Sequence, residues 1–227
     1  MSSDSNIVDG HGADSDHPLG PELLEISNQL RRITELVVRT DAPIKALDSA
    51  SVALTQAEVA LAQHVPPWIP SVGPMPSPDL EPNDYFPFSP VIGRYNPLAA
   101  PAEFVAKDGV VTGRVNLGAP YEGPPGCVHG GVIAEIFDEM LGVANISMGS
   151  GAMTGTLTIV YRSPTPLYTE LTLAAKTQGV DGRKVNTTGT IHAGDRLCAE
   201  AHGIFILVSG EGFVEHAKMH GGPAQNE

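Results

Sequence analysis

The spacing of hydrophobic positions divides this chain into segments, and the first segment has helical spacing. Apolar side chains between residues 21 and 65 form two runs, separated by Asp41-Ala42-Pro43 as a stop and restart. The second run repeats a leucine every seven residues. The pattern predicts a hairpin of two amphipathic helices over residues 21–65, each needing a partner surface: the protein's own core, a dimer mate or another protein. The apolar positions are Leu23, Ile26, Leu30, Ile33 and Val37, then Leu47, Leu54 and Leu61.

The segments on either side of this hairpin lack such periodicity. Residues 1–20 are rich in Ser, Asp, Gly and His, which predicts a flexible tail. Residues 66–101 hold eleven of the chain's 20 prolines, a density that blocks helices and interior strands. Because solvated linkers rarely carry aromatic residues, we expect this segment to wrap around the protein and cover a groove or a binding mouth. Its aromatic residues are Trp68, Tyr85, Phe86 and Phe88.

From residue 102 onward the period becomes that of β-strands around a single helix. Strand-like runs flank Asp108-Gly109, Asp181-Gly182 and Gly194-Asp195, which are hairpin signals. One helix followed by four strands implies an antiparallel sheet that curls around the helix, so we expect an α+β domain over residues 102–210 and a loose tail over residues 211–227. The expected strands are residues 102–107, 110–117, 152–162, 169–179, 183–193 and 196–208, and the expected helix is residues 130–147.

Candidate chemistry lies where that helix begins. The run Gly123-Pro124-Pro125-Gly126-Cys127-Val128-His129-Gly130-Gly131 directly precedes it. Two glycines after His129 let the backbone approach a bound group, and free N–H groups at a helix start favour a carbonyl oxygen that gains negative charge. Asp138, nine residues after His129, falls at the edge of the apolar face, where a carboxylate can be half-buried beside a ligand. The apolar face consists of Ile133, Ile136, Phe137, Met140 and Ala144.

These residues resemble a known family. His-Gly-Gly with an acid nine residues on, a long apolar helix and then strand-rich sequence is similar to the hotdog-fold acyl-CoA thioesterases of the phenylacetate-pathway (PaaI-like) type, in the branch with Gly-Pro-Pro-Gly before the motif. The similarity continues through residues 153–164 and covers about residues 100–208. It implies a hotdog fold, in which an antiparallel sheet wraps one long central helix, and hydrolysis of acyl-CoA to free acid and coenzyme A without a cofactor.

The resemblance also implies a role for each residue of the motif. The backbone N–H of Gly130, aided by Gly131, would hold the thioester oxygen, and Asp138 would act as general base or nucleophile. Thr154 would orient water beside that acid. Glu139 is the main rival for the acid, and the nine-residue spacing favours Asp138. In this family the glycine turn and the acid of one site come from different subunits, so a homodimer is the smallest active unit expected, and a further assembly into tetramers is compatible with it.

Other interpretations stay open at this point. A non-catalytic acyl-thioester binder or scaffold on the same fold is motivated by the hundred residues that precede the motif, because fold does not guarantee activity. Hydration or dehydration of an acyl thioester is a third possibility. His129 is either a cap that shapes the turn or a direct participant. Related enzymes often carry Asn six residues before the His, where this chain has Gly123, which leaves the ordering of His129 open.

Net charge limits which classes of partner the protein can bind. The net charge of −13 argues against nucleic acid, whose phosphates need a basic surface. The same field repels the phosphates of coenzyme A, which therefore need a local basic patch. The candidates are Arg162, Arg183 and Lys184, at strand ends or turns where a solvated surface charge is the commoner role.

The remaining signals concern compartment and cofactors. No apolar run approaches the ~20 residues of a membrane span, and residues 1–5 lack the basic and apolar regions of a secretory signal, so we expect a cytoplasmic protein. His192, Cys198 and His202 lack a paired ligand spacing, which predicts no metal site. The chain has no Gly-x-Ser-x-Gly elbow.

Overall fold

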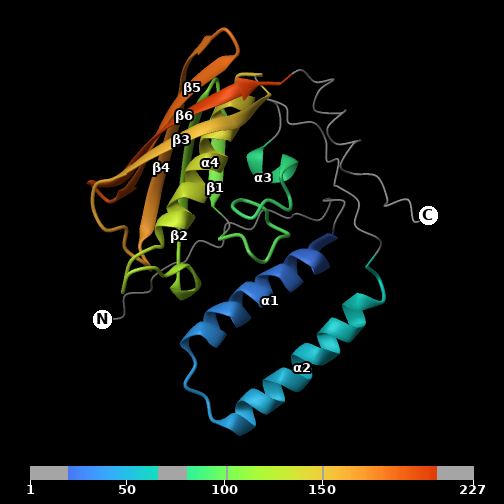
Figure 1. Cartoon of the computed structure of the whole chain (residues 1–227). Coiled ribbons are helices and arrows are strands. Elements are labelled where there is room, and N and C mark those ends of the chain that lie inside the picture. The colour runs from blue at the N-terminus through green and yellow to red at the C-terminus, as the bar shows by residue number, and fades with distance from the viewer. Residues whose placement is uncertain (1–19, 66–80, 101, 150, 209–227) are drawn as a thin grey trace, which may run out of the picture.

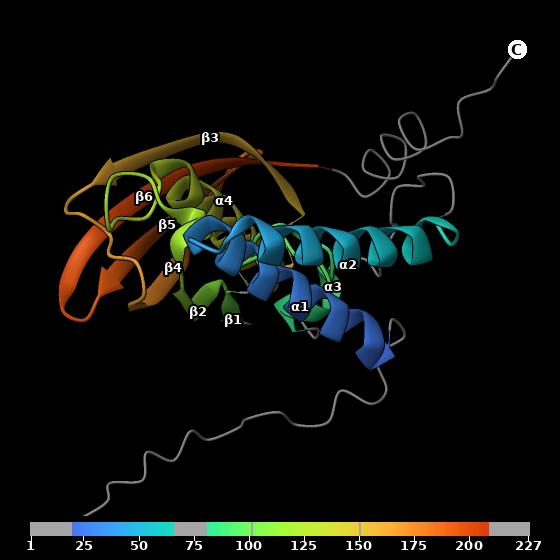
Figure 2. The same ribbon diagram turned by 90° about the horizontal axis from the view of Figure 1, so that it is seen from below.

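The computed structural model describes residues 20–65, 81–100, 102–149 and 151–208 (Figure 1). In these residues a curved antiparallel sheet wraps around one long helix, and a hairpin of two helices lies beside that domain (Figures 1 and 2). This is the α+β hotdog fold with an N-terminal helical extension that the sequence predicted. The tails expected at residues 1–20 and 211–227, and the aromatic Trp68, lie outside the described residues, apart from Gly20 at the start of the first helix.

The sheet has six strands in the order β1-β2-β4-β5-β6-β3, so that β1 and β3 form its edges. Every expected strand is present, with ends that differ from the prediction by at most two residues. The hairpin turns explain this agreement: Asp108 and Gly109 both have positive φ (50° and 77°), as a tight turn between twisted strands requires. The strands are β1 (Glu103–Lys107), β2 (Val110–Asn116), β3 (Ala152–Tyr161), β4 (Glu170–Asp181), β5 (Lys184–Ala193) and β6 (Arg196–Leu207).

The core forms between the inner face of the sheet and α4 (Gly130–Ser147), whose ends match the predicted helix. All five residues of the predicted apolar face are buried. Two glycines of the sheet bring the helix close, because a Cβ at Gly189 would lie 3.0 Å from Met140 and one at Gly203 would lie 3.1 Å from Leu141. Burial of each large side chain of this face stabilises the fold by roughly 1.5–3 kcal/mol. The position of α4 is therefore fixed by packing within one chain.

The predicted helical hairpin is present as α1 (Gly20–Arg39) and α2 (Ile44–Ala62). The polar face of α1 attaches it to the domain: Ser27 is buried and its hydroxyl donates to the Tyr95 carbonyl at 2.9 Å. Arg31 binds a cluster of backbone carbonyls that a guanidinium with five N–H donors can satisfy together. The apolar stripe of α1 does not pack against the buried core of the described domain. The carbonyls that accept from Arg31 belong to Gly93, Arg94, Asn96 and Ala99.

The described part of the proline-rich segment, residues 81–100, packs against the domain. It contains one short helix, α3 (Pro82–Tyr85). Val91 and Ile92 are buried in the core, and the side-chain amide of Asn83 donates to the carbonyls of Ile92 and Ala102 at 2.8 and 3.0 Å. This part of the chain thus joins α1 to the domain. The rest of the segment, residues 66–80, lies outside the described residues.

Candidate active site

The loop before α4 is held by its own backbone. The Gly123 N–H donates to the Cys127 carbonyl at 2.9 Å, and the His129 N–H donates to the Tyr121 carbonyl at 2.9 Å. A Cβ at position 123 would lie 2.7 Å from the Cα of His129, which a folded chain does not tolerate. Glycine is therefore required at Gly123 by close approach, and these backbone contacts fix the position of His129.

His129 caps the helix. Its Nδ1 accepts from the Gly131 N–H at 2.9 Å, which puts the proton of the neutral ring on Nε2. The His129 carbonyl accepts from the N–H groups of Val132 and Ile133 at 3.0 and 3.2 Å. Among the described residues, the N–H of Gly130 is the one donor of this first turn without an acceptor. The Gly131 N–H, expected to assist Gly130, is occupied by the imidazole.

Tyr161 contacts the other backbone polar group of Gly130, its carbonyl. This residue ends β3, and its hydroxyl donates to the Gly130 carbonyl at 2.9 Å. Tyr161 is 53% exposed, so it lies at the surface of the single chain. We did not predict this contact, because Thr154 and Tyr161 are seven residues apart and strict alternation would put them on opposite faces. A β-bulge between Thr154 and Thr156 restores both to the inner face.

Asp138 and Thr154 meet as the sequence led us to expect. The Thr154 hydroxyl donates to Oδ1 of Asp138 at 2.7 Å, from the inner face of β3 to the third turn of α4. Asp138 is exposed in the single chain, more than the half-buried position that its place on the helical wheel predicts. The carboxylate is thus fixed in orientation and open on one side.

Glu139, the rival acid, points to a different part of the molecule. Its carboxylate accepts a hydrogen bond from the side chain of Ser89, in the segment 81–100. Burial beneath that segment raises the pKa of Glu139 to about 7; the charges of Asp138 and Glu135 add to the rise, and the hydrogen bond from Ser89 opposes it. Because Glu139 is covered by its own chain, it is less accessible to a substrate than Asp138.

The free amide and the held carboxylate cannot meet within one chain. Gly130 and Asp138 are eight residues apart on α4, and a rise of 1.5 Å per residue separates them by about 12 Å along the helix axis. A thioester carbonyl would need both groups within hydrogen-bond or attack distance. One chain therefore does not bring these two groups to the same carbonyl.

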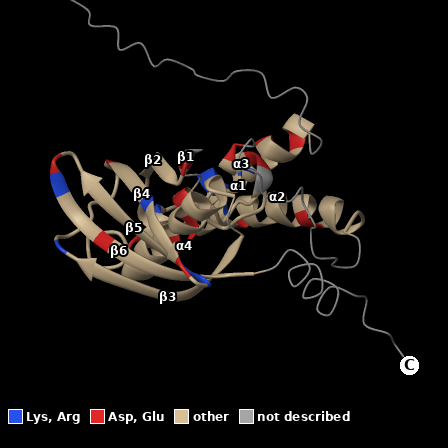
Figure 3. Cartoon of the chain, turned by 90° about the horizontal axis from the view of Figure 1, so that it is seen from above, with Lys and Arg blue, Asp and Glu red and all other residues tan. Residues whose placement is uncertain are grey.

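The edge strand beside these two groups is open. β3 has ten residues, no charged side chain and no buried residue (Figure 3). The strand holds Asp138 near one end, through Thr154, and Gly130 at the other, through Tyr161. Long uncharged edges favour pairing with another strand. A second chain at this edge would lie next to both groups.

The three basic candidates do not gather in one chain. Arg162 follows the Tyr161 end of β3 and pairs with Glu200. Arg183 and Lys184 lie at the opposite end, since Lys184 is opposite Ile206 and Ile206 is opposite Met153. The Arg183 guanidinium donates to the Leu207 carbonyl at 3.3 Å.

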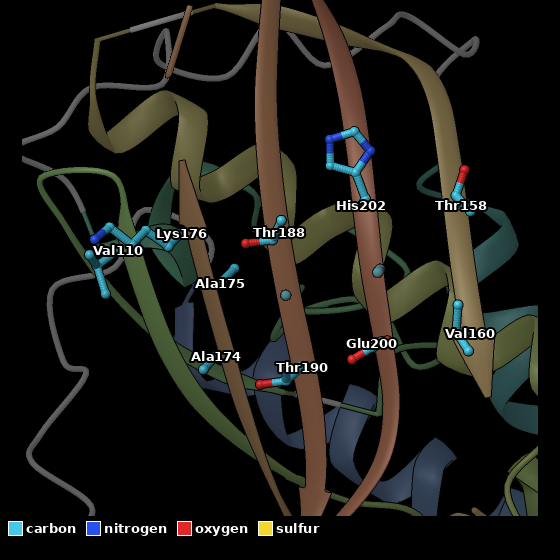
Figure 4. Close-up of a pocket in the computed structure, with 12 residues that line it drawn as sticks. Val110, Thr158, Val160, Ala174, Ala175, Lys176, Thr188, Thr190, Glu200 and His202 are labelled. Carbon is cyan, nitrogen blue, oxygen red and sulfur yellow. The ribbon is translucent and has the colours of Figure 1, made fainter. Parts of the chain in front are cut away.

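A hollow of about 510 Å³ lies on the outer face of the sheet, away from α4 (Figure 4). Lys176, Glu200 and His202 border it from β4 and β6, and small side chains such as Ala174 and Thr188 form its floor. Thr158 and Val160 of β3 also line it and belong to the face opposite Thr154 and Tyr161. The hollow is therefore separate from the candidate site, because the sheet lies between them.

No group of three or more His, Cys, Asp or Glu side chains among the described residues is placed to hold a metal ion. No helix in the described part of the chain is long and apolar enough to cross a membrane.

Known proteins resemble this chain in sequence and in fold. The Thioesterase superfamily matches residues 125–200. The crystal structure of one thioesterase superfamily protein superimposes with a TM-score of 0.71 at 36% identity, covering 81% of this chain and 90% of that protein. The match is longer than residues 102–208, so it includes part of the N-terminal extension.

Two curated relatives have a narrower match. Both are named acyl-coenzyme A thioesterase THEM4, and the chain is 40% identical to the Xenopus laevis protein over 90 residues and to the Mus musculus protein over 96. These matches cover 38% and 41% of this chain, and about two fifths of the length of the relatives. The fold, the motif and the structural match over nearly the whole of a relative agree: this chain belongs to the thioesterase superfamily.

Proposed function

We propose that this protein hydrolyses acyl-CoA thioesters to free acid and coenzyme A, at sites formed by two copies of the chain. Family membership and the names of the curated relatives support the reaction class. The observation that carries the proposal is the pair of half-sites on α4: an unused N–H at Gly130 and a carboxylate at Asp138 held by Thr154. A carbonyl bound between two such groups is polarised on its oxygen and open to attack on its carbon.

In the proposed reaction, water attacks the thioester carbon while Asp138 takes a proton from it. The carbonyl oxygen becomes an oxyanion that accepts from Gly130, aided by the positive end of α4. Collapse of this intermediate breaks the carbon–sulfur bond, and the coenzyme A thiolate takes the proton back. Alternatively, Asp138 attacks directly, and water then hydrolyses the resulting anhydride. Thr154 orients the carboxylate, and His129 holds the loop through its cap.

A two-fold axis between antiparallel copies of α4 would complete the site. Gly130 and Asp138 lie about 12 Å apart on each helix. When the two helices run antiparallel about a two-fold axis, Asp138 of each copy lies beside Gly130 of the other copy. The same axis pairs the two β3 edges near Leu157 and Thr158, midway between Thr154 and Tyr161. We therefore infer a homodimer with two shared sites, and a tetramer would assemble from such dimers.

Coenzyme A would be held at the rim of this site. Arg183 and Lys184 lie at the Asp138 end of β3, and two-fold pairing brings the partner's Arg162 to the same end. Glu200 already pairs with Arg162, which reduces its charge for a phosphate. We therefore assign the phosphates mainly to Arg183 and Lys184, which supply local positive charge on an acidic protein.

The direct experiment is the Asp138→Asn variant, assayed for coenzyme A release over a panel of acyl chain lengths. We expect turnover to fall by about 10³-fold, because the amide neither takes the proton nor attacks. Glu139→Gln is the matched control on the neighbouring position and should keep most of the activity. Full activity of Asp138→Asn would overturn the proposal. Tight acyl-CoA binding by the wild-type protein without hydrolysis, measured by calorimetry, would favour a binding or scaffold protein on the same fold.

A further inference from the structure

In the described part of the chain, the α2 helix is exposed along its whole length. None of its 19 residues is buried, although a helix of this length is marginal in water without a packing partner. Ten of the 20 exposed large hydrophobic residues in the described chain lie between Leu36 and Val65. Such a concentration of exposed apolar surface marks an interaction site.

The sequence of α2 specifies what kind of partner it needs. Residues 46–52 read Ala-Leu-Asp-Ser-Ala-Ser-Val and residues 53–59 read Ala-Leu-Thr-Gln-Ala-Glu-Val, so alanine, leucine, alanine and valine recur at the same heptad positions. A strict seven-residue hydrophobic repeat favours packing against another helix in a left-handed coil. The partner of α2 is therefore another helix.

The neighbouring helix α1 leaves this surface exposed. The two helices run side by side in the hairpin (Figure 1), yet Leu47, Leu54 and Leu61 remain 45%, 40% and 47% exposed. The apolar side chains of α1 are mostly half-buried, namely Leu23, Ile26, Leu30 and Ile33. The hairpin thus presents the apolar stripe of α2, and a second hairpin that packs on it would complete a four-helix bundle.

We propose that this hairpin packs against the hairpin of a second copy of the chain, and that the four helices form a bundle beside the catalytic dimer. This inference rests on the proposed function: the second copy is the same protomer that completes the proposed active site. It supplies helices of the same length and the same heptad period. Figure 1 shows α2 on the far side of α1 from the sheet, where it is open to a second hairpin.

Charge favours a second copy over a membrane surface. Helices that bind anionic lipid carry many lysines and arginines on their polar face, whereas α2 carries one lysine, Lys45, and two acids, Asp48 and Glu58. A chain of net charge −13 is repelled by anionic lipid, and also by its own copies over most of its surface. Nearly neutral α2 is a place where two copies can approach.

The experiment measures hydrogen exchange of α2 in the full chain over a range of protein concentrations, with sedimentation in parallel. We expect the amides of residues 44–62 to be protected where the protein is associated and to lose protection on dilution to monomer. Leu54→Asp puts a charge into the row formed by Leu47, Leu54 and Leu61, and it should abolish this protection. Gln56→Asp is the matched control, because it lies about 160° away around the helix and should leave the protection in place.

Two results would overturn the inference. Protection of α2 that persists in the monomer would mean that this chain's own segments cover it. A lack of protection at every concentration would mean that no second copy binds there. Neither hydrogen exchange nor sedimentation measures hydrolysis, so a negative result for the hairpin contact does not argue against the proposed active site. Conversely, an active Asp138→Asn variant would overturn the proposed active site and would not argue against the hairpin contact. A Leu54→Asp protein that still dimerises through β3 but has lost α2 protection supports two separate contacts.

Discussion

The two edges of the sheet differ in what they allow to bind. β1 has five residues and carries Glu103 and Lys107, with Glu103 paired to Arg114 of β2 at 2.7 Å. β3 has ten residues and no charge, and it positions both candidate catalytic groups. A short charged edge resists a new strand, whereas a long neutral edge admits one. In the proposed two-copy site, the second copy and the chemistry therefore share the β3 edge.

A loss approaching that of Asp138→Asn should come from removing the Gly130 N–H, the donor without an acceptor in the described first turn of α4. Gly130→Pro deletes the N–H, while proline is tolerated at the first position of a helix and the preceding residue, His129, already has an extended conformation (φ −61°, ψ 135°). We expect turnover to fall by about 10² to 10³-fold, the usual cost of an oxyanion donor.

Gly130→Ala is the matched comparison for that variant. It keeps the N–H, and its Cβ would lie at an ordinary 3.4 Å from the Tyr161 hydroxyl. Its activity should lie much nearer to that of the wild type. If both variants lose activity equally, the amide is not the group that matters at this position.

Charge on the open edge tests the comparison directly. Thr158→Lys places a lysine near the proposed two-fold axis, opposite its own copy, where like charges repel. The dimer dissociation constant should rise by about tenfold or more, and activity should return at higher protein concentration. Val105→Lys on β1, at a site that is 63% exposed, is the control and should change neither. Equal effects at the two edges, in sedimentation and in the assay, would contradict the assignment of β3.

A smaller loss is expected from the hydroxyl that orients the acid. Thr154→Val keeps the shape of the side chain and removes the donor to Oδ1 of Asp138. Turnover should fall by roughly three- to tenfold, since a single neutral donor to a charged group contributes on the order of 1.5 kcal/mol. The Michaelis constant should change little, and a change confined to it would assign Thr154 to binding instead.

A substitution at Glu139, on the covered side of α4, should change the free energy of unfolding rather than turnover. The pKa of Glu139 is raised from 4.5 to about 7 in the folded chain, so the folded state binds the proton more tightly and the free energy of unfolding falls as pH rises through that window. Glu139→Gln removes this loss. We expect the variant to be more stable than wild type by about 1–2 kcal/mol at pH 8.

The gain should shrink as the pH falls toward 5, where the wild-type carboxyl is protonated in the folded chain. Denaturant unfolding at the two pH values measures it. A gain that is the same at both would mean that ionisation of Glu139 is not its cause.

The sequence was sufficient for the sheet and for α4 because their signals are local. Hairpin turns such as Asp181-Gly182 end the strands, and the apolar stripe from Ile133 to Ala144 fixes the buried face of the helix. The contact between Asp138 and Thr154 was also anticipated, through the family resemblance.

Other contacts had no local signal. Tyr161 reaches Gly130 only because a bulge shifts the phase of β3. Arg31 attaches α1 through carbonyls more than 60 residues away in sequence, and the spacing of apolar residues in α1 carries no signal of this polar contact. Ser89 meets Glu139 because the segment 81–100 folds under α4, which no periodicity predicts.

The central claim is that each site takes its acid from one chain and its amide from the other. The most direct measurement mixes Asp138→Asn and Gly130→Pro proteins, each inactive alone, after dissociation and reassembly. In a mixed dimer one site keeps both an intact Asp138 and an intact Gly130, so random reassembly should restore about a quarter of the wild-type activity, as the symmetry of two shared sites requires. No recovery, in a sample where mixed dimers are shown to form, would contradict the account.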